Sequence, residues 1–146
     1  VTPSFFSAHT YYWGDRHAAI FMGPERSANM SPARWALDAG VRFSSHLDTP
    51  VTPMLPLQAV WSQVERESTG GAVIGPAQRI GRMPALRAVT INAAWQVFMD
   101  DEIGSIEPGK RADLVVLSEN PLTAEDIRGI KVERTVIDGA TVYARL

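Results

Sequence analysis

Residues 104–117 read GSIEPGKRADLVVL, and no other stretch of the chain carries as much information about its fold. The central Glu107-Pro108-Gly109-Lys110 has the composition of a turn, because proline fixes one backbone φ angle and glycine is free to take a positive one. The apolar run at 114–117 that follows is typical of a buried strand. We therefore expect a turn that leads directly into a β-strand.

The complete string resembles the C-terminal signature of the amidohydrolase superfamily, which comprises metal-dependent hydrolases and deaminases. In that family the segment leaves the catalytic (β/α)8 barrel, enters a small β-domain and contains no catalytic group. The resemblance implies an α/β chain in two parts. Residues 1–98 would be the C-terminal part of a TIM-type barrel, about strands six to eight, and residues 99–146 would be a β-rich segment of the composite β-domain.

The length of 146 residues suits one ordinary domain, whereas a complete barrel of this type needs about 250 residues. The chain opens inside an apolar, strand-like run at residues 1–6 and has no initiator methionine or leader. We therefore expect this chain to be the C-terminal portion of a longer protein.

The composition limits the classes of partner and ligand that we expect. A formal net charge of −2 and a pI near 5.9 give no basic surface, so nucleic acid and anionic membranes are not expected as partners. No segment is long and apolar enough to span a bilayer. The chain has no cysteine, which leaves any metal to histidines and carboxylates. Cytoplasmic location is the default expectation, and export stays open.

The first half of the chain has the pattern of an α/β protein. Residues 1–8 read as a strand, 9–17 as a polar and aromatic loop, and 41–45 as a second strand. Between them, residues 31–40 read as a helix, with Ser31 as N-cap and Gly40 just beyond the C-terminus.

The second half changes from helices to strands. Helical spacing is expected at 58–67 and at 84–98, with a glycine-rich loop at 70–81 between them. Strands are expected at 112–117, 132–137 and 141–144. The last two are joined by Asp138-Gly139, a strong hairpin signal.

The first candidate site lies at residues 3–15, PSFFSAHTYYWGD. The segment resembles the sixth-strand region of the superfamily branch that contains N-substituted formamide deformylase. In the superfamily the histidine that ends this strand binds the second metal of a binuclear centre, or contacts substrate or the attacking water in mononuclear members. His9 is the matching residue. Its alternative is a partly buried histidine that is hydrogen-bonded to a neighbouring carbonyl.

The second candidate site lies at residues 41–51, VRFSSHLDTPV, which resembles the eighth-strand region. There the family has an aspartate that binds the metal and takes a proton from the attacking water, and Asp48 matches it. A carboxylate can do both because it has two oxygens. The alternative is a turn-forming aspartate in Asp-Thr-Pro. His46 would share a strand face with Asp48 and could either support that residue or contact substrate, although it departs from the commoner Gly-Ser-Asp motif.

Four residues are candidates for substrate binding: Trp13, Asp15, His46 and Arg26. Trp13 and Asp15 belong to the segment after His9, where aromatic rings could line a pocket or simply pack together. Arg26 would reach the site from the short seventh-strand region, and its alternative is a solvated or ion-paired side chain.

The resemblance implies a divalent metal, with zinc as the expected ion and His9 and Asp48 as its ligands here. The first-strand His-X-His, the fourth-strand Lys or Glu and the fifth-strand His of the family have no counterparts in this chain. A catalytic zinc normally has three protein ligands, so we expect this chain alone to bind zinc weakly and to be inactive.

The expected function is that of a metal-dependent hydrolase acting on non-peptide carbon–nitrogen bonds of a small-molecule substrate, in an amide, formamide, cyclic imide or amidine. Asp48 and His9 would be the catalytic residues. The alternative is a non-catalytic regulatory or interaction module with the same fold. Because a cut barrel has open strand edges, we also expect self-association or a homo-oligomer.

Overall fold

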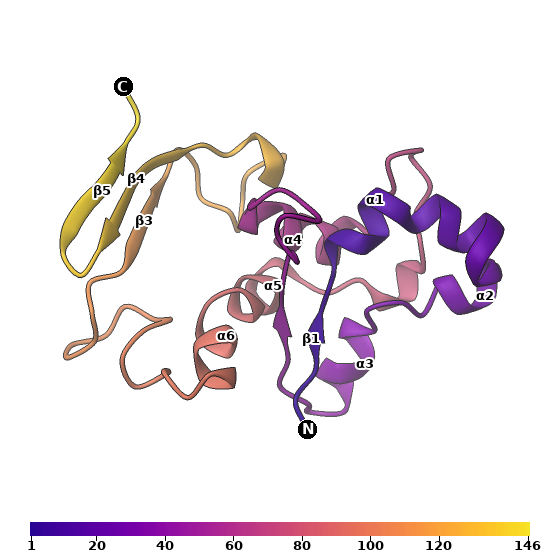
Figure 1. Cartoon of the computed structure of the whole chain (residues 1–146), viewed down its shortest axis with the longest axis horizontal. Helices are drawn as coiled ribbons and strands as arrows, with labels where there is room; N and C mark the ends of the chain where they lie inside the picture. The colour runs from indigo at the N-terminus through magenta and orange to yellow at the C-terminus, as the bar shows by residue number, and fades with distance from the viewer.

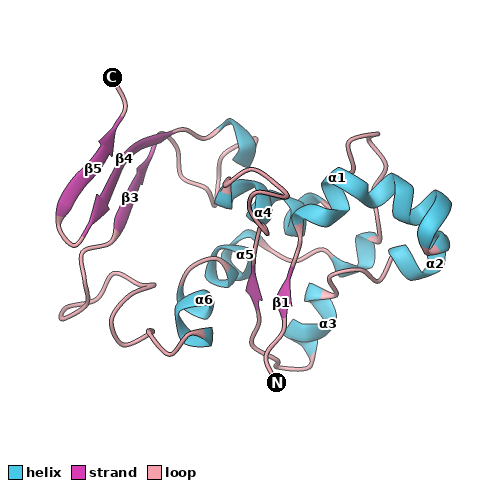
Figure 2. Cartoon of the chain, viewed as in Figure 1, coloured by secondary structure: helices cyan, strands magenta, loops and turns pink.

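The computed structural model describes all 146 residues, as a body of short helices around two strands and a three-stranded sheet beside it (Figures 1 and 2). The body contains, in chain order, β1 (Ser4–Phe5), α1 (Ala8–Arg16), the π-helical turn η1 (His17–Phe21), α2 (Gly23–Ser27), α3 (Ala33–Asp38), β2 (Ser44–Ser45), α4 (Pro56–Glu65), the 3₁₀ turn η2 (Pro76–Gln78), α5 (Arg82–Ala88) and α6 (Ile91–Gln96). The rest contains β3 (Leu114–Leu117), the 3₁₀ turn η3 (Ile127–Gly129), β4 (Val132–Ile137) and β5 (Ala140–Ala144).

The two strands of the body are direct parallel neighbours. Ser4 pairs with Ser44 and Phe5 with Ser45, and both arrows point the same way in Figure 2. The sequence predicted about strands six to eight of a barrel in residues 1–98, with Arg26 in the short seventh-strand region, and the structure has two strands here. Residues Gly23–Ser27 form α2 instead, because Pro24 and Glu25 occupy the first helical turn, where both residue types are favourable.

The N-terminal boundaries also differ from expectation. The predicted strand at 1–8 is reduced to β1, and the predicted loop at 9–17 is the helix α1. Its inward face is made of small residues, with Ala8, Thr10 and Gly14 buried. A Cβ atom on Gly14 would lie 2.7 Å from Cγ1 of Ile74, so glycine is what allows the chain to pack this closely. The aromatic residues between these positions concealed the helical pattern.

The helix predicted at 31–40 is present as α3, but Ser31 does not cap it. Ser31 has a φ of 44°, and Pro32 is the N-cap residue without a side-chain cap. The carbonyl of Ser31 instead accepts a hydrogen bond from Nη1 of Arg66 at 3.2 Å. At the other end Gly40 has a φ of 66°, which confirms its predicted place beyond the helix.

The single helix predicted at 84–98 is two helices, α5 and α6, separated at Val89 and Thr90. Thr90 leaves helical geometry, with φ −125° and ψ −103°, and its hydroxyl donates to the carbonyl of Leu86 at 2.8 Å. A threonine that bonds back to the preceding turn, next to a β-branched valine, competes with continuation of the helix.

The predictions for α4 and the C-terminal strands are confirmed in their main features. Lys110 N donates to the carbonyl of Glu107 at 3.2 Å and Gly109 has a φ of 93°, which makes the predicted turn before β3. Asp138 and Gly139 both have positive φ, 49° and 78°, as a tight β4–β5 hairpin requires. The sheet is antiparallel, in the order β3-β4-β5.

The hydrophobic core joins the two parts of the chain. Its buried residues come from α3, α4, α5, the positions just before β2 and α5, and the segment around η3, and they are Ala33, Ala36, Phe43, Val60, Trp61, Ile80, Ala85, Ala88, Ala124, Ile127 and Ile130. The η3 segment therefore packs on α4, while the β3–β5 sheet extends to one side (Figure 1). None of the helices has the length and hydrophobicity that crossing a membrane requires.

Candidate active site

The candidate site lies where β1 and β2 end. Because these strands are parallel neighbours, the residues that follow them meet at one edge. His46 N donates to the carbonyl of Phe5 at 3.1 Å, and the hydroxyls of Ser7 and Ser45 are hydrogen-bonded to each other. These contacts bring together the two segments that the sequence singled out, one carrying His9 and the other carrying Asp48.

Asp48 has a free carboxylate in an unusual backbone position. Its φ is 55°, in the left-handed region that aspartate tolerates better than most residues. Its carbonyl accepts from Val51 N at 2.8 Å, but the carboxylate makes no hydrogen bond or ion pair, and the residue is exposed. It lines a cavity of about 370 Å³, within the usual size range of small-molecule sites. The other lining residues are Ser45, His46, Leu47, Thr49, Met54, Pro56, Ala59 and Val89.

His46 lines the same cavity, for a different reason from the one predicted. Strand β2 ends at Ser45, so the alternation that would place His46 and Asp48 on one strand face does not apply. Nδ1 of His46 is instead hydrogen-bonded to the hydroxyl of Ser4 at 2.7 Å, which fixes the ring against β1. The two residues share a cavity because the chain turns back at Asp48.

His9 is the second residue of α1 and belongs to an aromatic cluster. Its ring stacks on Phe6, with 5.0 Å between centroids and 9° between planes, and Trp13 lies 5.0 Å away. Phe6 also stacks on His46 at 5.4 Å, so this one ring contacts the histidines of both candidate segments. Nε2 of His9 lies 3.2 Å from Nε2 of His17, within hydrogen-bonding distance.

The pKa of His9 is lowered from its ordinary value. Burial among these rings is the larger cause because it penalises the charged imidazole, and the neighbouring His17 adds electrostatic repulsion. The surroundings therefore favour a neutral imidazole at His9. A neutral ring has one donor nitrogen and one acceptor nitrogen.

The three remaining candidates have different surroundings. Trp13 packs on His9 and Phe6, beside the site. Both oxygens of Asp15 are used, accepting from Ser68 Oγ at 2.7 Å and from Gly70 N at 3.0 Å, which ties α1 to the loop after α4. Arg26 is exposed on α2, and its side chain has no hydrogen bond or ion pair. Substrate contact by these residues stays a prediction.

Two residues that the sequence did not single out prove to be important. His17 contacts His9 although eight residues separate them, about 12 Å along a straight helix, so no pattern of helical neighbours predicts the pair. Arg66 is 2% exposed and donates to the carbonyls of Met30, Ser31 and Ile74 at 2.8, 3.2 and 2.7 Å. Strand and helix patterns in the sequence do not indicate that a charged arginine will be buried and hydrogen-bonded to distant carbonyls.

The side chains of the candidate site provide only part of a metal-binding site. Asp48 offers an unpaired carboxylate at the wall of a cavity, as a ligand requires. His9 is half-buried and its Nε2 already faces His17. The structure contains no group of three or more histidine, aspartate or glutamate side chains arranged to hold a metal ion.

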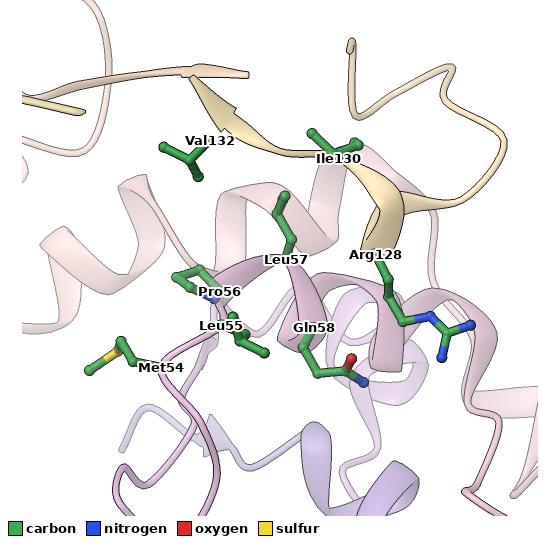
Figure 3. Close-up of a pocket in the computed structure, with 8 residues that line it drawn as sticks. All are labelled: Met54, Leu55, Pro56, Leu57, Gln58, Arg128, Ile130 and Val132. Carbon is green, nitrogen blue, oxygen red and sulfur yellow. The ribbon is translucent and has the colours of Figure 1, made fainter. Parts of the chain in front are cut away.

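A second hollow shares Met54 and Pro56 with the cavity beside Asp48 and lies between the start of α4 and the chain entering β4 (Figure 3). It measures about 180 Å³ and is mostly apolar, with Met54 at one end and Arg128 at the other. The Arg128 guanidinium lies 4.0 Å from the centre of the Trp61 ring and pairs with Asp126. Arg128 is thus engaged in packing, and the hollow lacks a free group for acid–base chemistry.

Comparisons with known proteins agree with the sequence motifs. The sequence profile of the Amidohydrolase family matches residues 1–143. N-substituted formamide deformylase of Arthrobacter pascens is 40% identical over 116 residues, covering 78% of this chain and 21% of the deformylase. An amidohydrolase from Thermotoga maritima MSB8 superposes with a TM-score of 0.60 at 31% identity, covering 80% of this chain and 27% of its own. An uncharacterized metal-dependent hydrolase from Pyrococcus horikoshii OT3 gives a TM-score of 0.70 at 21% identity, over 86% and 26%, and supports the fold alone. This chain therefore spans between 21% and 27% of the length of these relatives.

Proposed function

This chain belongs to the amidohydrolase family, and we propose that it is the C-terminal part of a metal-dependent hydrolase that cleaves non-peptide carbon–nitrogen bonds. The similarity to a formamide deformylase supports an amide or formamide as substrate, and a cyclic imide or amidine requires the same chemistry. The observation that carries the proposal is the unpaired carboxylate of Asp48 beside a cavity at the ends of two parallel strands. Active sites of (β/α)8 enzymes are built at this end of their strands.

The pairing of β1 with β2 supports the proposed barrel. Neighbouring strands of such a barrel are parallel, as β1 and β2 are here, and His9 and Asp48 follow these two neighbouring strands.

Asp48 is the general base and then the general acid of the proposed reaction. One oxygen accepts a proton from the attacking water, and the same group returns the proton to the departing nitrogen. Because no protein group pairs with the carboxylate, one oxygen is available for this proton transfer and the other for the proposed metal. Its exposure at a cavity wall, rather than in the core, allows water and substrate to reach it.

The other residues of the site bind and orient the substrate. Of the two roles predicted for His9, we propose the second, contact with substrate, because its Nε2 already faces His17. His46, fixed by Ser4, forms part of the same cavity wall as Asp48. Trp13 and Phe6 surround His9 with apolar rings, which limits the access of water to that side of the site.

Asp48 would also hold one position on the proposed metal, and the remaining ligands would come from residues outside this chain. When bound, a divalent metal such as zinc supplies Lewis acidity that lowers the pKa of a coordinated water. This division is consistent with the lining of the cavity, in which Asp48 is the single carboxylate.

The experiment is the Asp48→Asn substitution in the full-length enzyme that contains this chain. Asparagine keeps the shape but cannot accept the proton, so kcat for hydrolysis of an N-substituted formamide should fall by about 10²–10⁴-fold. Asp101→Asn is the matched control, since Asp101 is exposed and has no ion pair. If Asp48→Asn retains near-normal kcat, Asp48 is a turn residue and the proposal fails.

A further inference from the structure

The contact between His9 and His17 has no role in the reaction as described so far. Their Nε2 atoms are 3.2 Å apart, their ring centroids are 4.4 Å apart, and their planes are inclined by 64°. Phe6 and Trp13 pack around His9, and Phe21 packs on His17 at 5.7 Å. Neighbouring rings therefore pack against both imidazoles and restrict their movement.

Two neutral imidazoles that meet through Nε2 need one donor and one acceptor. Either His17 donates to His9 or His9 donates to His17, and each choice fixes the proton on the other nitrogen of the acceptor ring. The structure distinguishes the two because Nδ1 of His17 is buried and has no hydrogen-bond partner. Buried N–H groups without an acceptor are rarer than buried acceptors without a donor.

The proton of His17 therefore belongs on Nε2, where it has an acceptor, and Nδ1 keeps only a lone pair. His9 must then accept at Nε2 and carry its own proton on Nδ1. That nitrogen also has no partner within the chain, but unlike Nδ1 of His17 it is not a buried atom. It remains accessible to a ligand.

We infer that His17 is a positioning residue, which holds His9 in the Nδ1–H tautomer so that His9 donates a hydrogen bond to an oxygen of the substrate. This inference rests on the proposed function and names the atom that contacts substrate. The acceptor is the carbonyl oxygen of the amide or formamide, which gains negative charge during attack by water and binds a donor more strongly as it does so. His9 in this state has no free lone pair for a metal, because metal-binding nitrogens must be unprotonated.

The tautomers can be measured on this chain by long-range ¹H–¹⁵N correlation NMR of the imidazole rings at neutral pH. The expected result is His9 protonated at Nδ1 and His17 at Nε2. His46, the third histidine of the chain, is hydrogen-bonded to Ser4 and not to either ring of the pair, and it is the internal reference. A neutral His9 protonated at Nε2, or a cationic His9, would overturn the inference.

Two variants test the role of His17 itself. His17→Phe keeps an aromatic ring but has no donor, so His9 should lose its Nδ1–H preference. In His17→Gln the amide can still donate, and the preference should be at least partly restored. If His17→Phe leaves the His9 tautomer unchanged, His17 does not set it. Should that variant not fold, the wild-type spectrum alone still decides the assignment.

In the full-length enzyme His17→Phe should lower kcat by about 10–100-fold, as other partners that orient a functional imidazole do, while metal content stays unchanged. His17→Gln should recover part of the loss. Unchanged kcat in His17→Phe, or loss of the metal with it, would contradict a positioning role. The outcome for Asp48→Asn is independent, so failure of the proposed function can be told from failure of this inference.

Discussion

At Asp48 an uncommon backbone geometry coincides with a carboxylate that has no hydrogen-bond partner in the chain. A φ of 55° is unfavourable for most residues with a Cβ atom, and aspartate is one of the few that adopt it readily. A carboxylate in such a turn commonly bonds to a nearby backbone N–H, which this one does not. The carboxylate therefore stays open to water and to a ligand at the cavity wall, as the proposed role requires.

Arg66 shows how a single residue can hold distant segments together. Burial, with a smaller contribution from Arg79, lowers its pKa to about 10, so the guanidinium stays charged at neutral pH. Three carbonyls from residues 30, 31 and 74 take the place of a carboxylate partner. These contacts hold the chain before α3 against the loop after α4.

The lowered pKa of His9 predicts how the free energy of unfolding depends on pH. Because its pKa is lowered in the folded chain, the unfolded chain binds more protons as the pH falls through the ordinary histidine value. The contribution of neutral His9 is fully present above that value and is lost as the pH falls toward the lower, folded pKa. The free energy of unfolding, measured with urea from about pH 7.5 to about pH 5.5, should therefore decrease.

The comparison variant is His9→Gln, which cannot titrate. Its free energy of unfolding should decrease less than that of the wild type over the same range. If both proteins lose equal stability, the surroundings of His9 do not disfavour its protonation.

Among the elements, those specified by neighbouring residues could be predicted and those specified by distant ones could not. The Asp138-Gly139 hairpin and the turn at Pro108-Gly109 depend on backbone angles that these residues favour on their own. By contrast, β1 and β2 are two residues each. Their bounds depend on pairing between residues 40 positions apart in the sequence. The region of Asp48 was found by its motif, whereas the His9–His17 contact depends on how the helix and its neighbours pack.

The loop that leads into η2 provides a test at the level of an element. Gly75 and Gly71 both have positive φ, 62° and 82°, so alanine at either position should cost roughly 1–2 kcal/mol for the left-handed backbone. At Gly75 an added Cβ would also lie 1.8 Å from the carbonyl oxygen of Ala28, whereas at Gly71 it would meet nothing within 4 Å.

Gly75→Ala should therefore destabilise the chain clearly more than Gly71→Ala. The measurement is the difference in free energy of unfolding between the two variants. Equal effects would mean that the loop at 70–76 does not pack against α2 and the residue that follows it, as it does here.

At the scale of the whole molecule, this chain has unpaired strand edges in both of its sheets and exposed apolar side chains in the β3–β5 sheet. The β1–β2 sheet has only two strands, and each has an unpaired outer edge. In the β3–β5 sheet Val115 and Val116, which are adjacent and so face opposite sides, are both exposed. Every residue of β5 is exposed as well. Both faces and one edge of that sheet are thus uncovered.

Exposed edges and apolar faces of this kind favour pairing with another chain. We therefore predict that the chain self-associates at low micromolar concentration, and that sedimentation velocity will detect dimers or larger species. Val142 is 59% exposed on the edge strand β5, and Val142→Lys places a charge there, which should weaken association by discouraging strand pairing. Tyr143→Phe, also on β5, keeps the apolar surface and should associate like the wild type. A compact monomer that unfolds cooperatively at these concentrations would show that the open edges need no partner, and would contradict the assignment of residues 1–98 to a part of a barrel.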